Sequence, residues 1–213
     1  MVVEKLGFFS KLLGAIGKRF IFKFSQKINL YTCALIVQET VEVFKDVYGS
    51  YEVGMEEFNN ALLMGVRDMV ADMMDENIMF GKGLGDIVSR DPLDTPNAIG
   101  IGFWALMGAK SKKMIEKPIF IPAEETEEGI AKVVIGIKQC PFCCGADKSI
   151  KDKLKEGRHY GDFFALMIGG IIQEIMDYVG REYNIESKET KCFMDGDGKG
   201  ELTLYFHPRE PSS

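Results

Sequence analysis

The chain has no run of about 18 uncharged apolar residues, so no segment crosses a membrane by length alone. It also has no basic excess, because 26 lysines and arginines stand against 32 aspartates and glutamates and give a formal net charge of −6. Beyond residue 27 no Lys/Arg stripe outweighs the acids, which argues against a nucleic-acid-binding surface. A dinucleotide fingerprint is missing too: FGKGLGD at 80–86 lacks the GxGxxG spacing and follows no predicted strand, so we expect a loop there.

A disulfide framework of the secreted kind is also missing. The five cysteines are odd in number, and three of them are packed into CPFCC at 140–144. This usage indicates a protein of the reducing cytoplasm. The two histidines, His159 and His207, have no serine or cysteine nucleophile at a recognisable spacing, so we expect surface or capping roles for them and assign no catalytic residue.

The 213 residues are enough for one compact domain, and no low-complexity linker divides them. We therefore expect a basic amphipathic N-terminal helix over 1–27 and a single domain over 28–213. Lysines and an arginine alternate with phenylalanines and leucines in residues 1–24, which is typical of an anchor on anionic lipid or of a helix that packs on the domain or on a second subunit. We prefer the packing helix, because the rest of the chain has the composition of a soluble protein.

Apolar residues at spacings of three and four predict helices over 30–48 and 55–74, joined as an antiparallel pair by GSYEVG. A further helix is expected from Thr95, with Thr95 as its N-cap and Pro96 in its first position. Short strands are predicted around 118–121 and 130–139, with a solvated acidic turn between them.

The stretch from His159 to Phe206 holds the clearest pattern. It predicts a buried helix over 163–179 and then two strands, SKETKCFM and GELTLYF, joined by the glycine-rich turn DGDGKG. Glu189 and Cys192 are expected close together in the first of these strands. The pair Gly169 and Gly170 in mid-helix predicts close approach of another backbone or of a ligand.

The first helix pair resembles the opening of the transport-particle (TRAPP) subunits of Golgi vesicle tethering, in which a tyrosine-led helix precedes a glutamate-rich turn and an LxxMG helix. The closing unit, with its glycine-paired helix and two strands around a Gly-Asp-Gly turn, resembles the same subunits. The resemblance implies an α+β fold in which a helical layer packs on a small antiparallel sheet, the NO-signalling/Golgi-transport ligand-binding fold.

The same unit also resembles the 4-vinyl reductase domain family, which ends in a Glu-x-x-Cys strand, a glycine turn and a second cysteine eight residues on. Glu189 and Cys192 match this motif, whereas Gly200 stands where the second cysteine belongs. Over residues 28–207 the resemblance implies a small-molecule binder, of a family found as stand-alone archaeal proteins, beside chlorophyll synthesis genes and in aromatic-responsive activators. It also implies a homodimer formed through the helical layer.

Three interpretations of CPFCC remain open. In the first, Cys140, Cys143, Glu189 and Cys192 hold a structural zinc ion, because two thiolates two residues apart face one ion and the hairpin completes a tetrahedral set. In the second, Cys140 and Cys143 form a redox pair. In the third, the cysteines are small buried residues of a turn.

The expected function is the binding of an apolar, aromatic or tetrapyrrole ligand between the central helix and the sheet. The candidate pocket residues are Phe103, Trp104, Phe163, Met167, Gly169 and Gly170. The same residues are also what a plain core would contain. One alternative is a component of a tetrapyrrole vinyl reductase, which would need a separate electron donor because no nucleotide cofactor is indicated. The other is a dimeric adaptor like the tethering subunits.

Overall fold

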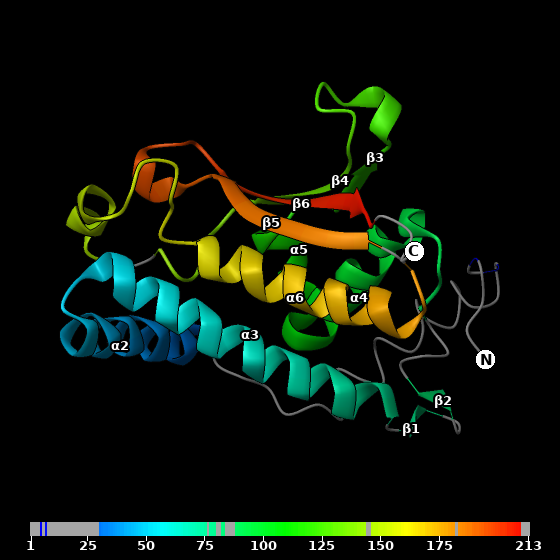
Figure 1. Cartoon of the computed structure of the whole chain (residues 1–213), viewed down its shortest axis with the longest axis horizontal. Helices are drawn as coiled ribbons and strands as arrows, with labels where there is room; N and C mark the ends of the chain where they lie inside the picture. Colours follow the sequence, from blue (N-terminus) through cyan, green and yellow to red (C-terminus); the bar gives the residue numbers. More distant parts are fainter. Residues whose placement is uncertain are drawn as a thin grey trace.

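The computed structural model describes residues 5, 7, 30–75, 77–79, 82–83, 88–143, 146–181 and 183–209. The α-helices cover one face of a four-stranded antiparallel sheet, and Figure 1 shows no described α-helix over the opposite face. The sheet has the strand order β3-β4-β6-β5. This arrangement confirms the α+β fold that the sequence predicts.

The elements follow in a simple order along the chain. The α-helices are α2 (Leu30–Tyr48), α3 (Tyr51–Asp75), α4 (Thr95–Met107), α5 (Ser111–Met114) and α6 (Asp162–Tyr178). The strands are β1 (Asn77–Met79), β2 (Lys82–Gly83), β3 (Ile119–Ile121), β4 (Ala131–Ile137), β5 (Tyr183–Lys191) and β6 (Gly200–Pro208). Short 3₁₀ helices are η2 (Pro92–Asp94), η3 (Gly108–Lys110), η4 (Ala123–Glu125), η5 (Lys148–Lys153) and η6 (Phe193–Asp195).

The helix pair α2–α3 has a tighter turn than the sequence predicts. Helix α3 begins at Tyr51 rather than near Met55, because the Ser50 hydroxyl accepts a hydrogen bond from the Val53 amide at 3.2 Å and caps the first turn. Gly54 therefore lies inside the helix, where a Cβ atom would stand 2.7 Å from the Lys45 amide nitrogen. The glycine allows the two helices to approach each other closely.

Two further predictions about element ends are wrong. Thr95 is not the N-cap of α4: the 3₁₀ helix η2 runs directly into it, so Thr95 already has helical dihedral angles and Asp94 occupies the cap position. The predicted loop 80–86 is partly strand, because residues 82–83 pair with β1 as β2.

The C-terminal hairpin forms as predicted, with two corrections: β5 begins at Tyr183, four residues before the predicted start, and it ends before Cys192. Glu189 lies in β5, opposite Leu202 of β6, but Cys192 lies one residue beyond the strand and starts η6. The register shifts between Glu189 and Lys191, and the chain leaves the sheet after Lys191, which still pairs with Glu201. The carboxylate of Asp197 accepts a hydrogen bond from the Cys192 amide at 2.9 Å. This bond fixes the backbone just after the end of β5.

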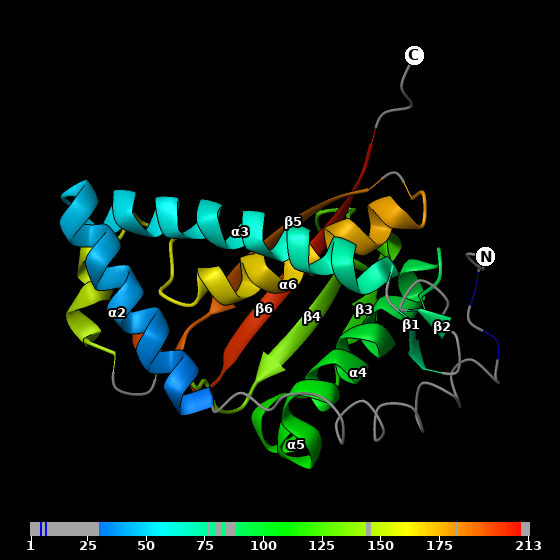
Figure 2. The same cartoon turned by 90° about the horizontal axis from the view of Figure 1, so that it is seen from below.

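Helix α6 lies between the sheet and α3, and it separates two hydrophobic clusters (Figure 2). The first cluster fills the space between the inner face of the sheet, α6 and α4, and includes Ile135, Leu204 and Ile172. The second lies at the other end of α6, between α2, α3 and the segment after β4. Its buried members are Ala34, Val41, Met55, Phe58, Phe142, Ile150, Tyr160, Phe163, Cys192 and Met194.

The predicted N-terminal helix over 1–27 lies outside the described residues, apart from Lys5 and Gly7. The Lys5 ammonium nitrogen lies 3.2 Å from a carboxylate oxygen of Asp91. None of the described helices is long and apolar enough to cross a membrane.

Candidate functional site

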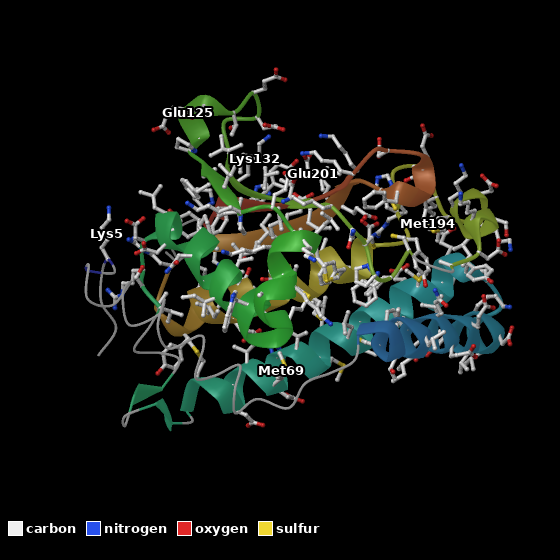
Figure 3. The ribbon with its side chains drawn as sticks, turned by 180° about the vertical axis from the view of Figure 1, so that it is seen from behind. Lys5, Met69, Glu125, Lys132, Met194 and Glu201 are labelled. Atoms are coloured by element: carbon white, nitrogen blue, oxygen red, sulfur yellow. The ribbon has the colours of Figure 1, made fainter. Side chains whose placement is uncertain are left out.

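The structure brings Cys140, Cys143, Glu189 and Cys192 together at the end of the sheet. Strand β4 ends shortly before Cys140, where the amides of Lys138 and Gln139 both donate to the Met114 carbonyl at 2.7 and 3.2 Å. The chain then turns through Cys140 to Cys143 beside the end of β5, so residues about 50 positions apart in the sequence meet. Figure 3 shows Met194, in the adjoining η6, at the same end of the molecule as η5 and the α2–α3 turn.

The four side chains form one continuous set of contacts. The Cys140 and Cys143 sulfur atoms lie 2.7 Å apart, and the Cys143 amide donates to the Cys140 sulfur at 3.3 Å. The Cys192 side chain lies near enough to both Cys143 and Glu189 to raise the pKa of each. We call these four residues the thiol–carboxyl cluster.

Glu189 is the most unusual member of the cluster, because it is a carboxyl group with only 4% of its surface exposed. Burial raises its pKa to about 10, and the neighbouring Cys192 sulfur adds to this effect. One carboxyl oxygen accepts a hydrogen bond from the Gly161 amide at 3.0 Å. A Cβ atom at position 161 would lie 2.5 Å from that oxygen, so only glycine allows this contact.

The three thiols differ in their electrostatics. Hydrogen bonding from Cys143 lowers the pKa of Cys140 and of Cys192, although burial opposes the change at both positions. The pKa of Cys143 is raised, because its proton is shared with Cys140 and Cys192. No lysine, arginine or histidine is among the groups that mainly shift the pKa values of the three thiols.

Asp162, which the sequence analysis did not single out, supports the cluster from the start of α6, and His159 lies beside it. The buried carboxylate of Asp162 accepts hydrogen bonds from the Glu189 amide at 3.1 Å and from the His159 amide at 3.0 Å. Ring atom Nδ1 of His159 lies 2.5 Å from an Asp195 carboxylate oxygen, so it joins the start of α6 to η6. The sequence signal for Asp162 was an acid in the first turn of a predicted helix.

The cluster has the right donors for zinc, but its sulfur atoms are too close together. Across residues 30–209, as far as the structure describes them, no group of three or more His, Cys, Asp and Glu side chains is already placed to hold a metal ion. A tetrahedral zinc ion with Zn–S bonds of about 2.3 Å holds its sulfurs roughly 3.8 Å apart. Cys140 and Cys143, at 2.7 Å, would have to separate by about 1 Å. The donor types are nevertheless those that zinc prefers, because two half-buried sulfurs, one buried sulfur and a buried carboxyl lie together.

A second feature lies beside the thiol–carboxyl cluster. Tyr160 is 1% exposed, and its hydroxyl has no hydrogen-bond partner among the described residues. Its pKa is raised by burial and by the neighbouring Cys143 and Cys140. Leaving such a hydroxyl unsatisfied costs about 1–3 kcal/mol, so this position calls for a polar partner.

Aromatic rings extend from Tyr160 through the second hydrophobic cluster into the first. Phe163 has its ring centroid 6.1 Å from that of Tyr160, 5.9 Å from that of Phe58 and 5.0 Å from that of Phe142. Phe142 lies 5.1 Å from Phe164, whose ring meets that of Phe103 at 6.0 Å. We call this row of rings, from Phe58 to Phe103, the aromatic seam.

The predicted pocket residues are divided between the two hydrophobic clusters. Phe163 lies in the second cluster, whereas Phe103 and Met167 belong to or pack against the first. The half-buried Trp104 is on α4. Gly169 faces Ser187 of β5, and Gly170 faces Leu63 and Val66 of α3, so protein side chains occupy the space beside both glycines.

The described part of the structure has two hollows that lie away from the predicted pocket residues. A small cavity of about 10 Å³ lies between η2, α4 and α6 beside Asp94 and Thr95, and an open surface hollow of about 390 Å³ lies at the α2–α3 turn beside Lys45 and Tyr51. Neither is lined by a predicted pocket residue. The assignment of those residues to a ligand therefore stays a prediction.

Comparison with known proteins identifies the fold. No family model and no curated protein matches the chain. Among solved structures, the chain is similar to trafficking protein particle complex subunit 3 from Naegleria fowleri, covalently bound to palmitic acid. The identity is 19%, the TM-score is 0.54, and the match covers 87% of this chain and 100% of that one. The chain thus has the fold of a transport-particle subunit.

Proposed function

We propose that this protein binds an apolar molecule with one polar end in the aromatic seam, with the polar end at Tyr160. The observation that carries the proposal is the buried hydroxyl of Tyr160, which no described residue satisfies. A carboxylate or hydroxyl of a ligand would satisfy it, while the apolar part would contact Phe58, Phe142 and Phe163.

The structural neighbour supports this choice of ligand class. That subunit is covalently bound to palmitic acid, a molecule with a long apolar chain and one polar end. An acyl chain in this protein would have to displace side chains of the second hydrophobic cluster, whose members include Met55 and Met194. Methionine is suited to such movement, because its unbranched side chain adapts to a new neighbour at little cost.

Binding of palmitate to the full chain tests the proposal. We expect saturable binding by isothermal titration calorimetry, and a loss of about 10- to 100-fold in affinity for Tyr160→Phe, as for one hydrogen bond to a charged group. Tyr178→Phe is the matched control, since Tyr178 lies half exposed on α6. The proposal would be contradicted if the unaltered protein did not bind palmitate, or if the Tyr160→Phe variant bound palmitate with the same affinity.

We also infer that the thiol–carboxyl cluster holds a structural zinc ion. Cys140, Cys143, Glu189 and Cys192 would be its ligands, and the ion would tie the end of β4 to the β5–β6 hairpin. Four protein ligands leave no open coordination position, so the ion would stabilise the fold rather than act on a substrate. The support is the convergence of three sulfurs with the buried Glu189 carboxyl, with no lysine, arginine or histidine among the groups that mainly shift their pKa values. No observation favours a vinyl reductase.

A second candidate role, as a homodimeric adaptor, is favoured by one surface. Helix α2 exposes Ile36, Val43 and Val47 to 60%, 57% and 70%, and their spacing of seven and four places them on one side of the helix. Such an uncharged stripe is self-complementary, so a second copy of the chain would bury it.

The oligomeric state of the protein, measured by light scattering after size-exclusion chromatography, tests whether this surface forms a dimer. We expect a dimer for the unaltered chain and a monomer for Val43→Glu combined with Val47→Glu, because facing carboxylates repel each other and lose hydration on burial. Leu93→Glu is the control, as Leu93 is equally exposed but lies on η2. A monomeric unaltered protein would end the dimer proposal.

A further inference from the structure

We propose that Cys140 and Cys143 form a reversible disulfide, which makes the CPFC turn a redox-sensitive modification site. This goes beyond ligand and metal binding and needs neither. The first observation is the distance of 2.7 Å between the two sulfurs. Thiols so close need only a small rotation of their side chains to reach the 2.03–2.05 Å of an S–S bond.

The backbone holds the pair in this arrangement. Residues 141–143 form a turn, and the Cys143 amide donates to the Cys140 sulfur at 3.3 Å. This contact holds the Cys140 sulfur inside the turn, next to the Cys143 sulfur. In the proposal Cys140 is the attacking thiol, and Cys143 is the second thiol that completes the bond.

The chemistry balances with a low-molecular-weight disulfide, such as oxidised glutathione, as the oxidant. The Cys140 thiolate attacks one sulfur of the oxidant, which forms a mixed disulfide and releases one glutathione thiolate. Cys143, after losing its proton, attacks the Cys140 sulfur, forms the protein disulfide and releases the second glutathione thiolate. Two protein thiols are oxidised, one small disulfide is reduced to two thiols, and the two protons pass to the released thiolates.

Cys143 has two neighbouring thiols, and the proposal pairs it with Cys140 and not with Cys192. Cys192 also touches Cys143, but it is fully buried and lies on another segment, whereas Cys140 and Cys143 are half buried in one turn. A small oxidant reaches the turn more readily than it reaches Cys192. Formation of the disulfide would also remove both turn sulfurs from the thiol–carboxyl cluster, so the oxidised pair and a bound zinc ion exclude each other.

Peptide mapping of the full chain tests the proposal. The reduced protein, with a chelator present, is incubated with oxidised glutathione, its remaining thiols are alkylated, and the digest is analysed by mass spectrometry. We expect loss of two alkylatable thiols, an internal Cys140–Cys143 link and full reversal by dithiothreitol. The Cys143→Ser variant should instead retain one glutathione at Cys140, and Cys33→Ser, with its substitution on α2, should behave as the unaltered chain does.

Two outcomes would overturn the proposal: no internal link in the unaltered protein, or a link that joins Cys192 or Cys144 in preference to Cys143. The mapping of the unaltered chain gives either answer even if a variant fails to fold. Because the protein is metal-free in this experiment, a negative result leaves zinc binding and palmitate binding to be decided by their own measurements.

Discussion

Removal of zinc is expected to lower the melting temperature of the protein by roughly 8–16 °C. An ion present at about 1,000 times its Kd stabilises the folded state by about 4 kcal/mol. For a chain of this size each kcal/mol corresponds to roughly 2–4 °C. The physical reason is that the ion ties the turn after β4 to the end of β5, two segments that the described structure joins at this point through the thiol–carboxyl cluster.

The ligand set is tested by substitution at the same time. Cys192→Ser should lose the metal and show the low melting temperature with or without added zinc, whereas Cys33→Ser should keep one zinc per chain. Cys33 is a suitable control, because it is a half-buried free cysteine on α2. Metal analysis of protein purified without added ions, followed by thermal unfolding, measures both quantities. An unaltered protein that contains no metal and does not respond to zinc would contradict this assignment.

Gly169→Ala is expected to destabilise the fold by about 3 kcal/mol, at the upper end of the usual cost of overpacking. The new Cβ atom would lie 2.3 Å from the Ser187 hydroxyl oxygen and 2.5 Å from the Ser187 Cβ atom. The Ser187 Cβ atom is attached directly to the backbone of β5, so the helix and the strand must move apart. The gain of about 1 kcal/mol from alanine in a helix does not offset this cost.

Gly170→Ala provides the matched control in the same helix. Its Cβ atom would meet the Leu63 side chain at 2.9 Å and that of Val66 at 3.2 Å, and the end of a leucine side chain can rotate away. We expect a change within about 1 kcal/mol, because the helix preference of alanine offsets the crowding. Chemical denaturation of both variants compares them. Equal stabilities would mean that α6 and β5 do not pack as closely as described.

Helices and strands were predictable here because their apolar periods are strong. The ranges of α2 and α6 agree with the predicted helices to within a residue or two, and β6 begins at the predicted Gly200. Strand β5 was predicted in kind but not in range, because it runs from Tyr183 to Lys191 instead of 187–194. Element ends were less predictable. Ser50 caps α3 with its hydroxyl, whereas Asp94 takes the N-cap position of α4 without a side-chain capping bond, because η2 runs directly into the helix.

The thiol–carboxyl cluster was predictable as a set of residues, although not in its geometry. Spacing and resemblance singled out Cys140, Cys143, Glu189 and Cys192, and the structure brings all four together. The supporting residues were missed, because Gly161 matters only through a carboxyl group 28 positions away. A single sequence contains no record of such long-range contacts.

The glycine pair shows where a pattern was ambiguous. Two glycines in mid-helix predict that something approaches closely, and they do not say whether it is a ligand or the protein itself. In the structure Ser187 takes the place beside Gly169, and the apolar residues expected around one pocket lie in two separate clusters. Tyr160, which carries the proposed function, has no sequence signal beyond its position before α6.

Native mass spectrometry of the full chain, purified without added ligand, tests the central claim most directly. The proposal that Tyr160 and the aromatic seam bind an apolar molecule predicts an organic adduct that persists under gentle conditions, is lost on denaturation and is depleted in the Tyr160→Phe variant. A chain that carries no organic adduct, and that takes up none when incubated with palmitate, would contradict it.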